Sequence, residues 1–369
     1  MTDADEVAAA IAALRGRIDA LDERILALLN ERARLAAEIG DQKRRVRPEG
    51  PLHAPARERE VLARLEAANP GPFPAPAVRA VFQEVMSACL ALEQPLRVAF
   101  LGPEGTFTHQ AVTRQFGLSA LALPLGTIGA IFDAVERGRA DYGVVPVENA
   151  SEGSVDPTLD AFLGRQVRIV GEILLPVEHA LLLHPRLELA AVERVYSHPQ
   201  ALGQCRRWLE AHLPRAQTVE APSTAEAARL AREDAAGAAI AAELAARLYD
   251  LRVGAERIQD LGGNATRFWV LGREPVPPSG HDRTTLIAVV RDRPGALLEL
   301  LQPIARRGLS LSRIQSRPTR RRLWEYAFFL DLEGHESDPA VAAALEDLRA
   351  TLVEVQVLGS YPHVEDAPH

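Results

Sequence analysis

The longest regular pattern in the chain is an apolar stripe near its N-terminus, and it limits the folds open to this region. Apolar residues recur there at alternating steps of four and three, the spacing of a helix face that packs against other helices. The stripe consists of Val7, Ile11, Leu14, Ile18, Leu21, Ile25, Leu28, Leu35 and Ile39. A helix of about 40 residues spans about 60 Å, which is too long for a compact three-helix monomer. We therefore expect it to pair with a second copy of the chain.

An arginine interrupts this stripe. The pattern predicts an apolar residue at position 32, where the chain has Arg32. A guanidinium keeps its charge, so leaving it unpaired inside a packed seam would cost several kcal/mol. Two interpretations are open. Either the stem packs while the head reaches solvent or a carboxylate such as Glu31 or Glu38, or the bundle has a polar pocket that holds an anion at this level.

Other charged residues of the first 95 positions bear on that choice. Lys43 is eleven residues after Arg32, within about 20° of the same helix face. Arg15 lies about 25 Å before Arg32 along the helix, so it can share a small ligand with Arg32 only from a partner chain. Glu93 ends an apolar face that includes Cys89. It is either a solvated helix end or a desolvated acid with a raised pKa.

Composition restricts the partners and the compartment. The 369 residues, 47% hydrophobic and 25% charged, suffice for two or three globular domains. A net charge of −8 argues against a nucleic-acid or anionic-membrane partner, so we interpret the run Arg320–Arg322 as a solvated turn. Two cysteines, Cys89 and Cys205, fit free thiols in a reducing compartment and show no metal-ligand spacing. The acidic start predicts no signal peptide and no window is expected to reach membrane-spanning length, so we expect a cytoplasmic protein.

The chain is predicted to have three modules of different fold class. Residues 1–95 are helical, broken by Pro/Gly-containing stretches at 45–55 and 69–77. Residues 96–273 alternate β-rich runs with Ala-rich helical stretches, as α/β domains do. A linker at 274–283 precedes residues 284–369, where the order βαββαβ predicts a ferredoxin-like α+β domain.

Polar clusters follow several predicted strands of the α/β module. They are "GPEGTFT" at 102–108, "VENASEGS" at 147–154, "SHPQ" at 197–200 and "GGNATRF" at 262–268. Open α/β sheets bind ligands at strand ends, so these clusters predict a site there. Their glycines do not follow the dinucleotide or P-loop spacing.

The last module begins with "RPGALLELL" at 293–301, where Pro294 and Gly295 stand at a helix start whose backbone N–H groups suit a small carboxylate. The segment "SRIQSRP" at 312–318 follows on the next predicted strand.

The helical module resembles the chorismate mutase module of bifunctional chorismate mutase/prephenate dehydratases, through "LRGRIDALDERILALLNERARLAAEIGDQK" and "ARERE". The resemblance implies a set of catalytic residues that clamp the dianionic substrate and bind its ring hydroxyl. They are Arg15 from the partner protomer, Arg32, Lys43, Arg57, Glu58 and Glu93. Glu93 stands where many members have Gln, and only a protonated carboxyl donates the same hydrogen bond, so we expect mutase activity to favour lower pH. Cys89, in the substrate site, replaces a common Ser, and Ala54 replaces an acidic residue of some members.

The α/β module resembles the prephenate dehydratase domain over nearly its full length, with "NATRF" as the most specific motif. The implied fold is two α/β lobes around a cleft, similar to periplasmic binding proteins. Thr266 matches the general acid that protonates the leaving hydroxyl while carbon dioxide departs, and Arg267 matches a residue that holds a substrate carboxylate or forms a surface ion pair. The other implied substrate-binding residues are Thr106, Thr108, Glu148, Asn149, Ser197 and Gln200. No metal or organic cofactor is implied.

The last module resembles an ACT domain, the regulatory module that binds phenylalanine at a dimer interface in these enzymes. The implied allosteric residues are Gly295, Ala296, Leu297, Leu298, Ser310, Gln315, Ser316, Arg317 and Pro318. Gln315 stands where Glu is usual and Ser310 where Asn is common, so the ligand and strength of inhibition are open.

The sequence thus predicts a cytoplasmic homodimer or higher homo-oligomer that converts chorismate to prephenate and prephenate to phenylpyruvate, with phenylalanine as effector. Two alternatives are open. One is a non-catalytic amino-acid sensor whose helices only dimerise, which leaves Arg32, Lys43 and Thr266 unexplained. The other is a dehydratase whose mutase module has decayed, which Ala54 suggests.

Overall fold

A computed structural model describes residues 3–46, 53, 55–291, 293–319, 325–352 and 354–364. Ala54 and Arg320–Arg322, which the sequence singled out, lie outside these residues. The chain divides into two units. One comprises the N-terminal segment through Leu96 together with Phe116–Ala120, and the other comprises Arg97–Gln115 and everything from Leu121 onward.

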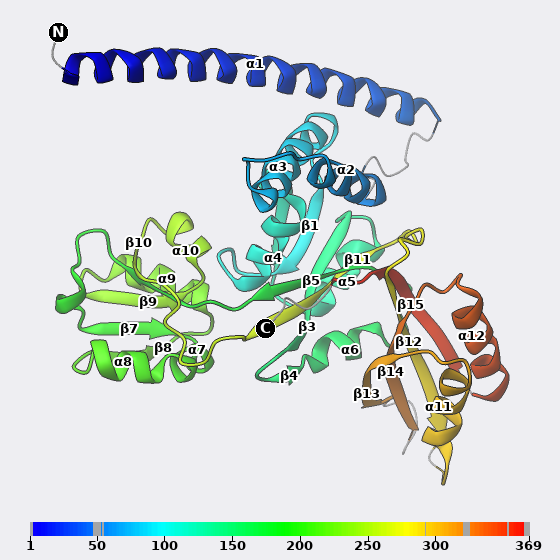
Figure 1. Cartoon of the computed structure of the whole chain (residues 1–369). Helices are drawn as coiled ribbons and strands as arrows, with labels where there is room; N and C mark the ends of the chain where they lie inside the picture. The colour runs from blue at the N-terminus through cyan, green and yellow to red at the C-terminus, as the bar shows by residue number, and fades with distance from the viewer. Residues whose placement is uncertain are drawn as a thin grey trace. The chain divides into compact units, whose positions relative to one another are not determined.

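The first unit is helical, as predicted (Figure 1). Its helices are α1 (Asp3–Val46), α2 (Pro55–Ala67) and α3 (Ala75–Glu93), and α3 contacts both of the others. The apolar stripe of α1 does not pack within this chain: its nine side chains are 45–63% exposed. The side of α1 with reduced exposure carries small residues instead, among them Ala33, Ala36, Ala37 and Gly40. Short side chains let two helix backbones approach closely, so this side forms the contact with α3.

Helix α3 corrects one sequence-based expectation. Its 19 residues are long and apolar enough, by length and composition, to cross a membrane, although no such window was expected. Val78, Met86 and Cys89 of α3 are buried in this structure. Length and composition alone do not distinguish a membrane span from the core helix of a soluble protein, and 22% of this window is buried in the structure.

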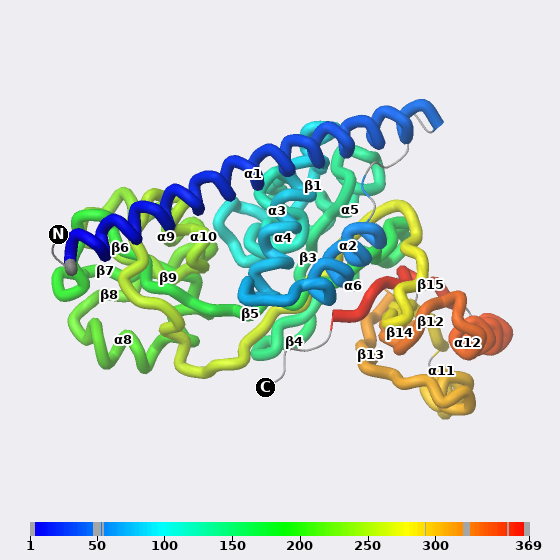
Figure 2. The backbone as a smooth tube through the Cα atoms, turned by 45° about the horizontal axis from the view of Figure 1, so that its top comes forward, coloured from blue at the N-terminus to red at the C-terminus, as the bar shows by residue number. Residues whose placement is uncertain are grey.

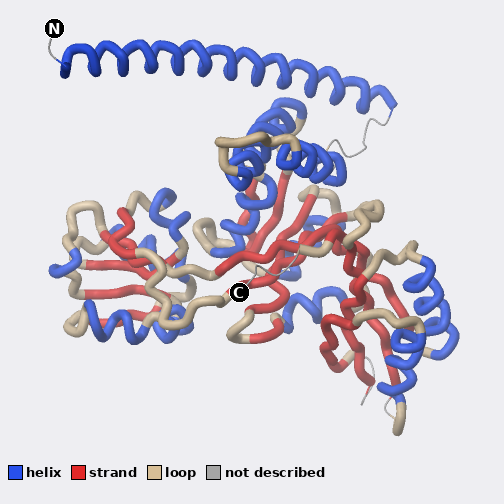
Figure 3. Tube along the Cα trace, in the orientation of Figure 1, coloured by secondary structure: helices blue, strands red, loops and turns tan. Residues whose placement is uncertain are grey.

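The dehydratase-like part of the second unit has two lobes, each with its own sheet and flanking helices (Figure 3). In the first lobe the strand order is β2 (Leu121–Leu125), β1 (Arg97–Leu101), β3 (Tyr142–Asn149), β11 (Ala265–Gly272) and β5 (Arg168–Pro176), with β4 (Gly153–Ser154) paired to β3. Its helices are α4 (Phe107–Phe116), α5 (Ile128–Glu136) and α6 (Asp156–Phe162). Strand β11 is antiparallel to both β3 and β5, so the chain returns from the second lobe into the middle of the first sheet.

The second lobe has the strand order β10 (Arg252–Ala255), β6 (Ala180–Leu183), β9 (Gly237–Ala241), β7 (Arg194–Ser197) and β8 (Gln217–Glu220). Its helices are α7 (Pro199–Gln204), α8 (Arg206–His212), α9 (Thr224–Glu233) and α10 (Glu243–Leu248), with a short 3-10 helix at Leu189–Ala191. Alanines of α9 and β9 fill the core on one side of this sheet, and their small volume allows helix and sheet to pack closely.

The C-terminal domain has the predicted order βαββαβ: β12 (Asp282–Arg291), α11 (Ala296–Arg306), β13 (Leu311–Pro318), β14 (Glu325–Glu333), α12 (Pro339–Thr351) and β15 (Glu354–Pro362). Its antiparallel sheet runs β13-β14-β12-β15. Both helices cover one face (Figure 2). The opposite face packs on the first lobe, where Phe329 and Leu358 share one core with Ile169 and Trp269. The predicted combination of a helical module, a two-lobed α/β domain and an α+β domain is confirmed.

Candidate active and regulatory sites

The arginine that interrupts the apolar stripe contacts the third helix. Arg32 is partly buried, and its Nη1 donates to Sγ of Cys89 at 3.0 Å. Sulfur is a weak acceptor, so this contact leaves most of the hydrogen-bonding capacity of the guanidinium for another partner. The head group therefore points toward α3, and neither Glu31 nor Glu38 forms an ion pair with it among the described contacts.

Glu93 lies against α1 at the far end of the same helix contact. A Cβ added to Gly40 would come within 2.3 Å of Oε2 of Glu93, so a larger residue at position 40 would displace the carboxyl. Burial raises the pKa of Glu93, and the opposing influence of Lys43 is smaller. Arg32, Cys89, Lys43 and Glu93 thus follow the contact between α1 and α3, and Glu93 retains its proton to a higher pH than an ordinary carboxyl.

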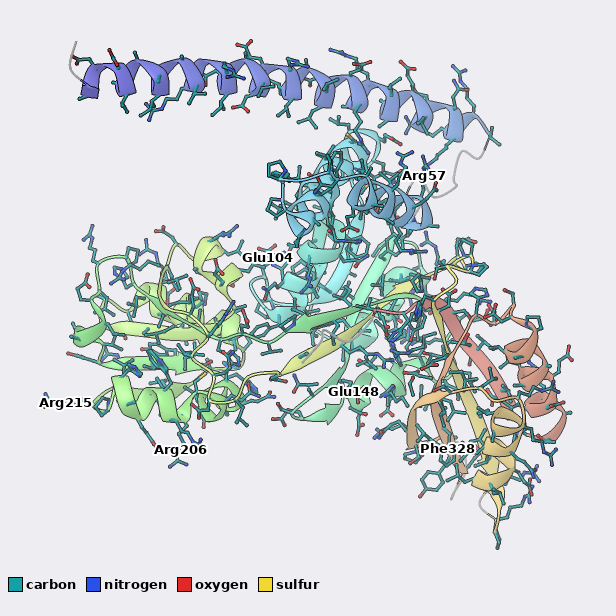
Figure 4. The ribbon with its side chains drawn as sticks, viewed as in Figure 1. Arg57, Glu104, Glu148, Arg206, Arg215 and Phe328 are labelled. Carbon is teal, nitrogen blue, oxygen red and sulfur yellow. The ribbon has the colours of Figure 1, made fainter. Side chains whose placement is uncertain are left out.

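The remaining mutase candidates make local contacts. Arg57 is exposed and pairs with Glu60 at 2.5 Å, and Glu58 pairs with His53 at 3.1 Å (Figure 4). Arg15 is exposed on α1, seventeen positions before Arg32. At 1.5 Å per residue this separation is about 25 Å, so one chain does not bring Arg15 to Arg32.

A cavity of about 240 Å³ lies between the two lobes of the dehydratase-like part. Its lining comes from β3, β11, α4, α7, the start of α9, and the segments that connect the lobes. The lining residues are Phe107, Asn149, Val177, His179, His198, Gln200, Ala201, Gln204, Pro222, Ser223, Thr224, Asn264 and Thr266. None of these side chains is a lysine, arginine or carboxylate, so the cavity offers neutral hydrogen-bonding groups.

Thr266 and Asn149 form the polar centre of this cavity. The antiparallel register places Thr266 of β11 opposite Asn149 of β3, and Nδ2 of Asn149 donates to Oγ1 of Thr266 at 2.8 Å. Oδ1 of Asn149 accepts from the backbone N–H groups of Ser151 at 3.0 Å and Glu152 at 3.2 Å, which fixes the orientation of the amide. Because the threonine oxygen accepts from Asn149, its own proton is free to be donated to a ligand.

Several cavity residues were missed by sequence reasoning. His179 is 3% exposed, and its Nε2 lies 2.8 Å from Oε1 of Gln204. Burial lowers the pKa of His179, so the ring is neutral near pH 7. The ring of Phe107 meets that of His179 edge-on, with centroids 5.4 Å apart. Gln204 stands four residues after Gln200 on α7, so helical spacing was a usable signal for it.

The other predicted dehydratase residues differ in their placement. Gln200 lines the cavity. Thr106 acts at the start of α4, where its Oγ1 accepts from the N–H of His109 at 3.3 Å. Thr108 is buried, and Ser197 is fully buried with its hydroxyl donating to the carbonyl of Ile240 at 2.7 Å. The structure therefore does not bring Thr106, Thr108 and Ser197 into the cavity lining.

Glu148 and Arg267 lie on the opposite side of the first sheet from the cavity. Successive residues of a strand point to opposite faces, so the neighbours of Asn149 and Thr266 point away from it. Arg267 pairs with Asp331 of the C-terminal domain and with Glu172 at 3.2 Å. Arg267 therefore has its ion-pair partners outside the cavity, which agrees with the ion-pair interpretation of this residue, although the pair with Asp331 is buried.

A further contact joins the two lobes across the cleft. The hydroxyl of Tyr249, which follows α10 in one lobe, donates at 2.9 Å to the backbone carbonyl of Glu104, in the loop after β1 of the other lobe. Gly105 has a positive φ of 85°, and a Cβ there would come within 3.0 Å of the Tyr249 ring. Glycine is therefore required both by the backbone conformation and by the close approach.

The predicted allosteric residues lie at the start of α11 and along β13. Gly295, with φ of 84°, caps α11, where Ala296 begins the helix and Leu297 and Leu298 are 42% and 68% exposed. Ser310 is exposed just before β13. Along β13, partly buried and exposed residues alternate, so Gln315 and Arg317 share one face of the strand while Ser316 and Pro318 share the other.

Comparison with known proteins covers all three parts of the chain. Residues 14–94 match the model of the chorismate mutase type II family, residues 98–276 that of prephenate dehydratase, and residues 284–350 that of the ACT domain. A bifunctional chorismate mutase/prephenate dehydratase of Stutzerimonas stutzeri is 45% identical over 365 residues, which is 98% of this chain and 99% of that protein.

Two solved structures resemble the second unit. The crystal structure of a prephenate dehydratase from Arthrobacter aurescens in complex with L-Phe is 40% identical, with a TM-score of 0.68 over 72% of this chain and 90% of that chain. A structure described as a novel type of quorum quenching acylase is 33% identical, with a TM-score of 0.67 over 72% of this chain and 98% of that chain. Since a relative with the full three-part length is 45% identical, this chain belongs to the family of bifunctional chorismate mutase/prephenate dehydratases.

Proposed function

We propose that this chain rearranges chorismate to prephenate in its helical module, and converts prephenate to phenylpyruvate in the cleft between its α/β lobes, under inhibition by phenylalanine. We assign the first activity to residues 1–95, the second to 96–273 and regulation to 284–369, with a linker at 274–283. The observation that carries the dehydratase assignment is the Asn149–Thr266 hydrogen bond within a neutral cavity.

The dehydratase step uses the free proton of Thr266. The substrate ring loses its carboxylate as carbon dioxide, the bonding electron pair enters the ring, and the ring hydroxyl departs as water with a proton that Thr266 donates. Asn149 holds the threonine oxygen so that its proton points to the leaving group, and water from the cleft restores that proton. The reaction removes a negative charge from the substrate, so a cavity lined by uncharged groups stabilises the transition state relative to the more highly charged substrate.

The retained carboxylate of prephenate requires donors, and the cavity lining supplies them. Ser223 and Thr224 lie at the start of the ten-residue helix α9, where backbone N–H groups point out of the helix. A helix N-terminus suits a carboxylate through its N–H groups and dipole. Gln200 and Gln204 add side-chain amides from α7, and the neutral His179 positions Gln204.

The mutase step is a unimolecular rearrangement, so the protein has only to hold a compact conformer of chorismate and stabilise charge on the breaking ether oxygen. Arg32 and Lys43 supply cations along the contact of α1 with α3. Glu93, in its protonated form, donates to the ether oxygen. Arg15 acts from a second chain, because it is too far from Arg32 within one chain.

The chain acts as a homodimer or higher homo-oligomer in the cytoplasm. The exposed apolar stripe of α1 supports the dimer, because long apolar helix faces are covered in stable proteins. The buried free thiols Cys89 and Cys205 are compatible with a reducing compartment. No metal or organic cofactor is required, since each step needs only hydrogen bonds, cations and one proton.

A paired assay tests the whole proposal. Chorismate depletion and phenylpyruvate formation from added prephenate are measured on the full chain, with and without phenylalanine. Turnover of both substrates, with phenylalanine slowing the second, is expected. Turnover of prephenate alone would indicate a decayed mutase. Phenylalanine binding without turnover of either substrate would indicate a sensor.

A further inference from the structure

A group of charged residues, all buried or nearly so except the 40% exposed Glu148, lies between the first lobe and the sheet of the C-terminal domain. It contains three arginines and three carboxylates, here called the charged interface: Arg267, Arg283, Arg313, Glu148, Glu172 and Asp331. The side chains of Glu172 and Asp331 are 2% and 0% exposed. Charges buried this deeply are tolerated only when each meets opposite charge, so loss of one partner destabilises the others.

Strand β13, which carries the predicted effector motif, contributes directly to this interface. Nε of Arg313 lies 3.5 Å from Oε2 of Glu148, and its Nη2 donates to Oγ of Ser154 at 3.2 Å. Four residues on, Arg317 donates to both oxygens of Asp160 at 2.9 Å. Alternation along the strand puts both arginines, with Gln315 between them, on the face toward the dehydratase domain and leaves Ile314 and Ser316 on the other face.

The contacts of Arg313 converge on the hairpin that carries Asn149. Glu148 and Ser154 are paired across β3 and β4, so Arg313 holds both strands of this hairpin at once. Asn149 follows Glu148 directly and reaches Thr266 with its amide. Thr266 is also held in place by the C-terminal domain, because the next residue, Arg267, pairs with Asp331 of β14. The regulatory sheet therefore contacts the residues adjacent to both halves of the Asn149–Thr266 pair.

We infer that Arg313 is a positioning residue for prephenate dehydration. It holds the β3–β4 hairpin so that Asn149 stays hydrogen-bonded to Thr266. Phenylalanine bound beside β13 inhibits the reaction by moving Arg313 away from this hairpin. The inference rests on the proposed function and adds the route of its regulation. Hydrogen bonds weaken steeply beyond about 3.5 Å. Since the Arg313 contacts are already 3.2–3.5 Å long, a strand shift of about 1 Å would break them.

The test compares Arg313→Met with Arg307→Met in the full chain. Arg307 also belongs to the C-terminal domain, but it pairs at the surface with Asp347 at 2.7 Å and contacts no residue of the charged interface among the described contacts. For Arg313→Met we expect kcat for prephenate to fall 10- to 100-fold, with KM changed less than threefold. This fall corresponds to an increase of roughly 1.4–2.7 kcal/mol in activation free energy. Calorimetry should show that phenylalanine still binds, while the residual rate no longer responds to it. Arg307→Met should retain both rate and inhibition.

Two milder variants exclude a purely structural role. Arg313→Lys keeps a point charge for Glu148 but not the planar fork that also reaches Ser154, so it should recover part of the lost kcat. Ser154→Ala removes one contact and should lower kcat several-fold without changing the melting temperature. Failure of the lysine to recover any rate, with melting temperature falling in step with rate across the variants, would overturn the inference in favour of a structural role.

Unchanged kinetics and full inhibition in Arg313→Met would also overturn the inference and leave the proposed function intact. A wild-type chain that does not consume prephenate would overturn the proposed function and the inference with it.

Discussion

The helical module and the dehydratase cleft differ in whether one chain alone brings their site residues together. In the cleft, one chain brings Thr266, Asn149 and the residues of α7 and α9 around a cavity, although Asn149 and Thr266 are 117 positions apart in sequence. In the helical module, the apolar stripe of α1 stays exposed and Arg15 is too far from Arg32 to act with it. The difference teaches that a sheet collects distant residues within one chain, whereas a single long helix separates its own residues and depends on a second copy.

Thr266→Ala should produce the largest difference between the effects on the two activities. Loss of the general acid should lower kcat for prephenate by about 10²- to 10⁴-fold, while chorismate turnover changes less than twofold. Steady-state rates on both substrates measure this. Thr266→Ser, which keeps the hydroxyl, should retain a measurable part of the rate. Full prephenate turnover by the alanine variant would refute the role of Thr266.

Charged substitutions in the apolar stripe of α1 test whether the mutase depends on a second chain. Leu21→Glu with Leu28→Glu places charge on the exposed apolar face and should separate the chains. Withdrawal of the partner's Arg15 removes one charged hydrogen bond of about 1.5–3 kcal/mol, so chorismate turnover should fall roughly 10- to 100-fold. Analytical ultracentrifugation and both assays check this, with Glu23→Ala as a surface control. A wild-type monomer with full mutase activity would contradict the prediction.

Glu93 should make chorismate turnover depend on pH in a way that prephenate turnover does not. Burial raises the pKa of its carboxyl, so the protonated donor is present at low pH and is lost as pH rises through that pKa. Chorismate turnover should therefore fall from pH 5 to pH 8, and Glu93→Gln should flatten this fall. At pH 8 the variant should exceed wild type by about three- to tenfold, the effect of one hydrogen bond of roughly 1 kcal/mol. Parallel pH profiles for the two proteins would rule out the protonated donor. Dehydratase rates serve as the internal control.

The smallest effect is expected in the regulatory strand. Gln315→Glu restores the residue usual in the ACT motif, on a partly buried strand face that it shares with two arginines. A partly exposed charge pair is worth about 0.2–1 kcal/mol, so the phenylalanine concentration for half inhibition should fall only about two- to fivefold. Inhibition curves with Gln315→Met as the uncharged control measure this. Weaker inhibition in the glutamate variant would show that its charge is drawn to Arg313 and Arg317 and not to the effector.

Local pattern was sufficient for much of the fold. The breaks at 45–55 and 69–77 separate α1, α2 and α3, and the predicted order βαββαβ is the observed order from β12 to β15. Spacing of apolar residues and Pro/Gly positions carries this information because helix and strand periods depend on nearest neighbours. The same spacing did not reveal that the small residues of α1, such as Ala36 and Gly40, form its contact with α3, because short side chains leave no apolar stripe.

The candidate site was predictable only in part. The cavity lining includes Thr266, Asn149 and Gln200, which the sequence predicted. It also includes Gln204 and His179, which the sequence did not predict. The ion pairs of Arg267 could not be foreseen, since Glu172 and Asp331 come from distant strands.

The residues alone determined that there are three modules, their fold classes and the chemistry that their motifs support, because these follow from short-range periodicity and local residue combinations. Which face each polar side chain takes was decided by tertiary structure. The register of β11 against β3 turns Thr266 and Asn149 into the cleft and Arg267 and Glu148 toward the regulatory sheet, and a shift of one residue would exchange them. Strand pairing between segments 117 positions apart sets that register, and no local pattern contains it.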